Sequence, residues 1–125
     1  MLARAYYAKS ALKGFDFAQL NLGLIYLYGL GVKNDYEKAA TLFLSAAQQG
    51  NAKAQGYLGY LYSDGMGVKK SLIEAYAWLS VSVANGNENS KNNLNIVKNK
   101  LDETALKESE LKAKNYQTKY LPHKK

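Results

Sequence analysis

Apolar side chains recur along most of the chain at spacings of three and four residues. One such set is Ala54, Leu58, Leu61 and Tyr62. Another is Tyr36, Ala39, Ala40, Phe43, Ala46 and Ala47. Because an α-helix turns once every 3.6 residues, this spacing gathers the apolar side chains of each set on one helical face. The pattern therefore predicts amphipathic helices and an all-α protein.

The helical pattern repeats along the chain. When the sequence is shifted by 36 residues, so that Gly14 meets Gly50, residues 14–49 and 50–85 share many identities. The identical pairs are Gly14/Gly50, Ala18/Ala54, Gln19/Gln55, Leu22/Leu58, Gly23/Gly59, Tyr26/Tyr62, Gly29/Gly65, Gly31/Gly67, Val32/Val68, Lys33/Lys69 and Ala39/Ala75. Chance would give about two or three such pairs. Each 36-residue unit reads as two helices, so the chain is predicted to be a stack of helix pairs.

The repeat frame divides the whole chain. Residues 1–13 correspond to the second helix of a partial leading repeat, 14–49 and 50–85 are full repeats, and 121–125 are a tail. Residues 86–120 are predicted to be a degenerate capping helix pair, because Asn95 and Lys98 replace the expected Gly and Tyr. We therefore expect about seven helices in one domain.

Polar residues mark where these helices begin. Asn51 and Asn87 precede first helices, Asp35 and Ser71 precede second helices, and Asp102 precedes a last helix that runs to about Tyr120. Side chains of these types cap helix N-termini by accepting a hydrogen bond from the backbone. Ser71 and Glu74 have the spacing of a capping box.

The glycines have two predicted roles. Gly23 and Gly59 fall within first helices, where close approach of the paired helix explains the absence of a side chain. The G-x-G pairs Gly29/Gly31 and Gly65/Gly67 follow helices and predict left-handed helix ends and the turn back. A phosphate-binding G-x-G would follow a strand instead, so the sequence disfavours nucleotide binding.

The motif A-x-x-x-L-G-x-x-Y-x-x-G-x-G-V occurs from Ala18 to Val32 and again from Ala54 to Val68. With the second-helix stretches YEKAATLFLSAAQQG and IEAYAWLSVSVANG, it resembles the Sel-1-like repeat (SLR) family, which is related to tetratricopeptide repeats. The resemblance implies an α-α superhelix, a right-handed solenoid of antiparallel helix pairs. It also implies an adaptor, scaffold or regulatory role in which a partner protein or peptide binds the concave face.

Composition is compatible with this reading. The 125 residues are 47% hydrophobic, lack cysteine and carry a net charge of +7. No apolar run reaches the length of a membrane span, and the first residues do not form a secretory signal. The default location is therefore the cytoplasm, or the periplasm or envelope if the N-terminus was trimmed. The compartment, the organism and the identity of the partner stay open.

Residues for catalysis or metal binding are sparse. The single histidine, His123, falls in the tail, and the acidic residues are scattered at caps and helix faces. A catalytic site needs a proton-transfer or nucleophile set in a rigid place. The sequence therefore predicts a protein that is not an enzyme and has no cofactor and no metal.

Carrying over the geometry of tetratricopeptide-like solenoids assigns partner binding to the outward residues of the first helices. The predicted binding residues are Phe17, Leu20, Leu24, Leu27, Tyr28, Lys53, Tyr60, Ser63, Asn92 and Ile96. Other tyrosines occupy apolar positions of the repeat frame and are predicted to pack in the core: Tyr7, Tyr26, Tyr36, Tyr62 and Tyr76.

Three alternatives stay open for the binding surface. The apolar residues Phe17, Leu20 and Leu24 could pack on a missing helix, or on a second copy of the chain that forms a homodimer through the N-terminal repeat edge. The family resemblance also allows a toxin-neutralising role for the chain, because some relatives are immunity proteins. The basic C-terminal part could contact nucleic acid or an anionic membrane surface through Lys107, Lys112, Lys114, Lys119, Tyr116 and Tyr120, although interleaved acids disfavour nucleic acid.

Overall fold

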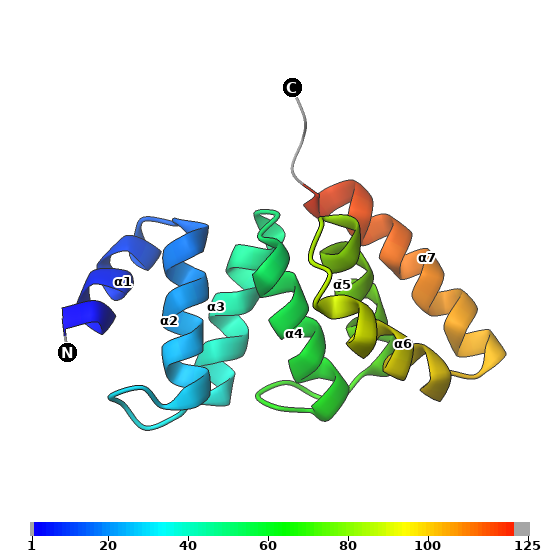
Figure 1. The fold of residues 1–125 in the computed structure, drawn as a ribbon, viewed down its shortest axis with the longest axis horizontal. Coiled ribbons are helices and arrows are strands. Elements are labelled where there is room, and N and C mark those ends of the chain that lie inside the picture. Colours follow the sequence, from blue (N-terminus) through cyan, green and yellow to red (C-terminus); the bar gives the residue numbers. More distant parts are fainter. Residues whose placement is uncertain (1, 122–125) are drawn as a thin grey trace.

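The computed structural model describes residues 2–121, and over that range the chain forms seven α-helices and no strand. The helices are α1 (Leu2–Leu12), α2 (Asp16–Tyr28), α3 (Tyr36–Gln48), α4 (Ala52–Asp64), α5 (Leu72–Ala84), α6 (Ser90–Lys100) and α7 (Glu103–Tyr120). Each helix from α1 to α5 packs on the next one along the chain, so the pairs form a row (Figure 1). The predicted all-α solenoid is confirmed.

Four of the predicted helix starts are confirmed. In each, a side-chain oxygen accepts a hydrogen bond of 2.8–3.1 Å from the backbone N–H three residues later. The capping residues are Asp35, Asn51, Ser71 and Asp102. Since these N–H groups have no partner within the helix, the caps satisfy donors that would otherwise be lost on folding.

Two predictions about helix starts are wrong. Asn87 does not cap α6, which begins only at Ser90; its amide instead donates to Ser82 Oγ at 3.0 Å. The capping box is incomplete, because the Glu74 carboxylate accepts from Lys112 and Tyr116 of α7 rather than turning back to Ser71. In both cases a tertiary contact takes the side chain away from its local role.

The glycine positions behave as predicted. Gly65 ends α4 at φ 69°, in the left-handed region, and Gly67 follows at φ 74°. A Cβ atom on Gly23 would lie 2.6 Å from the Phe43 ring, and one on Gly59 would lie 2.7 Å from Leu79 Cγ. Both contacts are too short for real atoms, so the two helices of each pair approach as closely as they do because these residues are glycine.

Four of the five tyrosines predicted to be in the core are half-buried. Tyr26 and Tyr62 pack against the main core cluster, Tyr76 packs beside Leu79, and Tyr7 lies in α1. Tyr36 is the exception, since 38% of its surface is exposed at the first turn of α3. The repeat frame assigned this position to the core, but here it faces a groove that is described below.

Each full repeat contains a glutamine with a shared structural role. The Gln55 side chain is fully buried, and its amide donates to Ala47 O at 3.0 Å, at the C-terminal end of α3. Gln19 donates at 3.5 Å to Ala11 O in the same way. Each of these helix-end carbonyls also accepts a backbone hydrogen bond, from Gly50 N–H and Gly14 N–H respectively, so the glutamine supplies a second donor to it. Gln55 also donates to Tyr120 O at the end of α7, at 2.9 Å.

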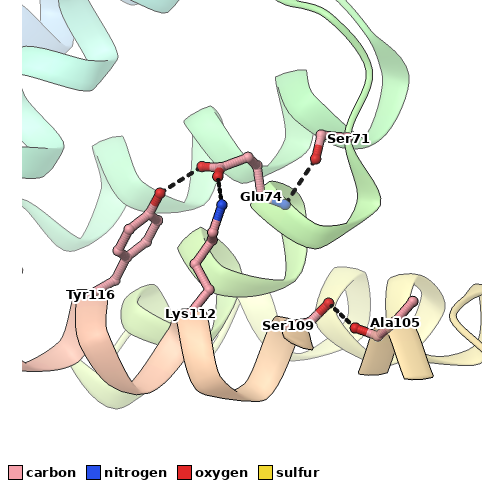
Figure 2. Close-up of polar contacts among 6 residues, drawn as sticks. All are labelled: Ser71, Glu74, Ala105, Ser109, Lys112 and Tyr116. Atoms are coloured by element: carbon pink, nitrogen blue, oxygen red, sulfur yellow. Dashed lines mark hydrogen bonds and ion pairs between the residues drawn. The ribbon is translucent and has the colours of Figure 1, made fainter. Parts of the chain in front are cut away.

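The last helix does not continue the repeat geometry, since it packs on α5 and not on its predecessor α6. Both α6 and α7 pack on α5, and α7 also reaches α3. Figure 2 shows how α7 is held: Lys112 Nζ lies 2.5 Å from Glu74 Oε2, and the Tyr116 hydroxyl donates to Glu74 Oε1 at 2.7 Å. Glu74 belongs to α5, so these contacts join the two helices.

An aromatic cluster lies beside this polar contact. The Trp78 ring is 2% exposed and lies 4.7 Å from the Tyr116 ring and 5.1 Å from the Tyr120 ring, measured between centroids. Such pairs add about 0.5–1.5 kcal/mol beyond burial of their area. Three residues considered for phosphate contact, Lys112, Tyr116 and Tyr120, are thus used to hold α7 in place, whereas Lys107, Lys114 and Lys119 are exposed.

Candidate binding groove

The first helices α2, α4 and α6 border a groove of about 610 Å³. Its lining combines leucines, tyrosines and amide side chains. The lining residues are Leu20, Asn21, Leu24, Leu27, Tyr28, Tyr36, Lys53, Gly56, Tyr57, Tyr60, Met66, Asn87, Asn89, Ser90 and Asn93. The volume falls within the range of roughly 300–1,000 Å³ that is common for ligand pockets.

The apolar part of the groove has a buried floor and exposed walls. Leu20 and Leu27 are only 8% and 6% exposed, so they belong to the core and form the floor. Tyr28 is 61% exposed and Tyr60 is 38% exposed, so the walls offer aromatic side chains that a partner could bury. The Tyr57 ring stacks on Phe43 with centroids 5.2 Å apart, which ties the groove to the core.

The structure gathers only part of the predicted binding set. The predicted residues that line the groove are Leu20, Leu24, Leu27, Tyr28, Lys53 and Tyr60. The remaining ones, Phe17, Ser63, Asn92 and Ile96, lie outside its lining. Phe17 stacks instead on Phe15, with ring centroids 6.0 Å apart, and Ser63 Oγ donates to Tyr60 O within α4.

Sequence reasoning missed the contribution of the hinge between repeats. Met66, in the G-x-G hinge after α4, and Tyr36, at the start of α3, both line the groove. Met66 lies near Tyr36 because its neighbour Gly67 is in close contact with the Tyr36 backbone. A Cβ atom on Gly67 would collide with the Tyr36 carbonyl. The sequence did contain a sign of this contribution: both units place an apolar residue between the hinge glycines, Leu30 in the first and Met66 in the second.

The other end of the groove is rich in amides and is held rigidly. Ser82 Oγ, contributed by α5, donates to Ala52 O at 2.7 Å and lies 2.9 Å from Ser90 Oγ. Asn87 donates to Ser82 Oγ, so the loop before α6 is fixed to α4 and α5. Among the lining residues Lys53 is the only one with a formal charge.

Two tyrosines of the groove, Tyr57 and Tyr60, have raised pKa values. The pKa of Tyr60 is raised, first by the negative charge of Asp64 and then by burial. Burial also raises the pKa of Tyr57, and the neighbouring Tyr28 adds to the effect. A protonated phenol can donate a hydrogen bond, so the groove can bind by apolar contact and hydrogen bonding.

Residues 2–121 contain no candidate metal cluster and no candidate membrane span. In this part of the chain no group of three or more His, Asp or Glu side chains could hold a metal ion. None of the described helices is both long enough and apolar enough to cross a membrane. His123 lies outside the described residues.

Comparison with known proteins places this geometry in context. The family model described as Sel1 repeat matches residues 1–15, 16–51 and 52–87. A comparison with curated proteins found no match.

Several solved structures are similar to the chain, among them the following two. One is c5321, a protective antigen of uropathogenic Escherichia coli with an SLR fold, at 37% identity and a TM-score of 0.91 over 94% of this chain. The other is a Sel1 repeat protein from Oxalobacter formigenes, at 28% identity and a TM-score of 0.76 over 91% of this chain. The chain spans 25% of the first protein and 49% of the second.

Proposed function

Because this chain belongs to the Sel1 repeat family, we propose that it is a non-catalytic protein-interaction module that binds a partner protein or peptide in the groove between α2, α4 and α6. Sel1 repeats commonly mediate protein–protein interaction and are generally a non-catalytic fold.

The groove is the observation that supports the proposal. It offers exposed aromatic walls, Tyr28 and Tyr60, above a leucine floor that is fixed in the core. Tyrosines are enriched among the residues that dominate binding energy, because a large rigid ring loses little conformational entropy when it is buried. An apolar segment of a partner would bury these rings, while the amides at the other end could bond its backbone.

The test is affinity capture with a matched pair of variants. Tyr28→Ala removes a groove tyrosine that is 61% exposed, and Tyr6→Ala removes a tyrosine of α1, outside the groove, that is 60% exposed. The wild-type chain, immobilised, captures a partner from the native cell, and the affinity of that partner is then measured for each variant. We expect Tyr28→Ala and Tyr60→Ala to weaken binding by at least about fivefold, as for an interface anchor worth more than 1 kcal/mol.

Tyr6→Ala should bind as the wild type does. Equal capture by all three variants would refute the groove as the binding surface. Circular dichroism of each variant checks that the helices remain folded. We avoid Leu24→Asp as a primary test, since Leu24 packs on the core cluster and its loss would also reduce stability.

A further inference from the structure

Three apolar side chains lie exposed at the corner between α1 and α2. Leu12, at the end of α1, is 90% exposed, and Phe15 and Phe17, at the start of α2, are 51% and 46% exposed. The two phenylalanine rings stack on each other. We call these three residues the corner patch. None of them lines the groove, so the proposed function does not account for them.

Comparison with the next repeat shows that packing of the helix pairs does not require apolar side chains at the positions of the corner patch. One period later the same positions are Gln48, Asn51 and Lys53. Gln48 and Lys53 are exposed although helix pairs lie on both sides of them. A further repeat in front of α1 would therefore leave Leu12 and Phe17 uncovered as well. This removes a missing helix as the explanation for Phe17.

The charge around the corner patch is positive. The first fifteen residues carry Arg4, Lys9 and Lys13 and no acidic residue. The nearest acid, Asp16, already accepts a hydrogen bond of 3.0 Å from Asn51 Nδ2. A second copy that docked through its own corner patch would bring Lys9 and Lys13 of both copies together against only the two Asp16 carboxylates, and this excess of positive charge opposes self-association.

The partner that fits is apolar and negatively charged at once. We propose that the corner patch inserts into the surface of a membrane that contains anionic lipids. The patch is a projecting corner rather than a pocket, and a Cβ on Gly14 at its tip would meet nothing within 4 Å. Projecting Leu and Phe side chains enter the headgroup boundary, while Lys side chains contact the lipid phosphates.

The same edge of the molecule carries further cations. Figure 1 shows the α1–α2 corner, the α3–α4 corner and the C-terminal end of α7 along one edge. Lys53 lies in the first turn of α4, and Lys119 in the last turn of α7. Each basic residue close to an anionic surface adds about 1 kcal/mol of attraction, so the edge can lie along the membrane once the corner patch is inserted.

The experiment is flotation of the purified chain with lipid vesicles. Vesicles of phosphatidylcholine alone are compared with vesicles that also contain phosphatidylserine. We expect the chain to float with the phosphatidylserine vesicles and to be partly released as salt is raised, because salt screens the lysines but not the apolar contact. Leu12→Asp and Phe15→Ser should each reduce partition by about tenfold or more, since each removes one buried apolar side chain.

Two variants keep the test specific. Leu111→Asp changes a leucine of α7 that is 64% exposed and far from the corner in the sequence, and it should float like the wild type. Tyr28→Ala should also float normally, which separates this proposal from the groove. Phe15→Ser is not expected to unfold the chain, because serine at this helix start supplies a cap that Phe15 lacks.

Each other outcome overturns the proposal. Absence of flotation with phosphatidylserine, or flotation that neither corner variant reduces, would exclude membrane insertion of the patch. Equal flotation with phosphatidylcholine alone would exclude selection of anionic lipid. A concentration-dependent dimer in light scattering that Leu12→Asp abolishes would identify a second copy of the chain as the occupant.

Discussion

The hydroxyl of Tyr116 offers a sharp test of how α7 is held. Tyr116→Phe keeps the ring beside Trp78 and removes only the hydrogen bond of 2.7 Å to Glu74. Hydrogen bonds to charged groups contribute about 1.5–3 kcal/mol. Since Glu74 keeps Lys112 as a partner, we expect the lower end, a loss of about 1.5 kcal/mol in the free energy of unfolding. For a chain of this length that corresponds to a fall of about 5 °C in Tm.

The assay is urea unfolding followed by fluorescence. Trp78 is the only tryptophan, and it lies against Tyr116 and Tyr120, so its emission reports directly on the docking of α7. Tyr116→Ala removes the ring as well and should cost about 3 kcal/mol, the lower end for loss of a large aromatic side chain because Tyr116 is half-buried. Tyr6→Phe, at an exposed position, is the control and should leave stability unchanged.

The pH dependence of the difference between wild type and Tyr116→Phe provides a second readout. Burial, followed by the hydrogen bond to Glu74, raises the pKa of Tyr116 well above its ordinary value of 10.0. The folded state therefore favours the protonated phenol, and its contribution is fully present below pH 10 and is lost as the pH rises beyond 10. The stability difference between the two proteins should shrink above pH 10. The reasoning is refuted if Tyr116→Phe matches the wild type at neutral pH, or if the difference grows above pH 10.

Three further predictions concern the packing and ends of the helices. Gly59→Leu should lower the free energy of unfolding by roughly 1–3 kcal/mol, because the added atoms collide with Leu79 and with the backbone of α5; an unchanged Tm would remove this explanation for the glycine. Asp102→Ala should cost about 1 kcal/mol in urea unfolding through loss of the cap on α7, whereas Asn89→Ala should cost almost nothing, since Asn89 makes no cap bond. Gln55→Leu should destabilise the fold by about 1–3 kcal/mol and increase amide exchange at the end of α7, because it removes the side-chain donor to the Tyr120 carbonyl and one of the two donors to the Ala47 carbonyl; exchange like that of the wild type would contradict this.

The full repeats were predictable because their signals are local. Hinge glycines and capping side chains act on backbone groups a few residues away, so Gly65, Asp35 and Ser71 specify where helices end and begin without reference to the rest of the fold. Gly59 signalled a close contact because glycine is costly within a helix, and the structure supplies the contact as Leu79.

The C-terminal part and the groove were less predictable because their contacts are distant in sequence. Asn87 has the composition of a cap, but the buried hydroxyl of Ser82 takes its amide, and nothing within its own turn signals that. Glu74 meets Lys112 across 38 positions. Met66 and Tyr36 both line the groove because the hinge after α4 is in close contact, through Gly67, with the start of α3 in the preceding repeat. Such pairings depend on how units stack, which a single unit's sequence does not encode.

The contact of α7 with both α5 and α3 has a consequence for how the chain unfolds. In a linear array each unit interacts only with its neighbours, so the units can melt one after another from the ends. Because α7 reaches α3 as well as α5, and its last carbonyl is bonded by Gln55 of α4, it couples elements of both full repeats. Loss of α7 would weaken both units together, so residues 14–121 should melt as one cooperative block rather than repeat by repeat.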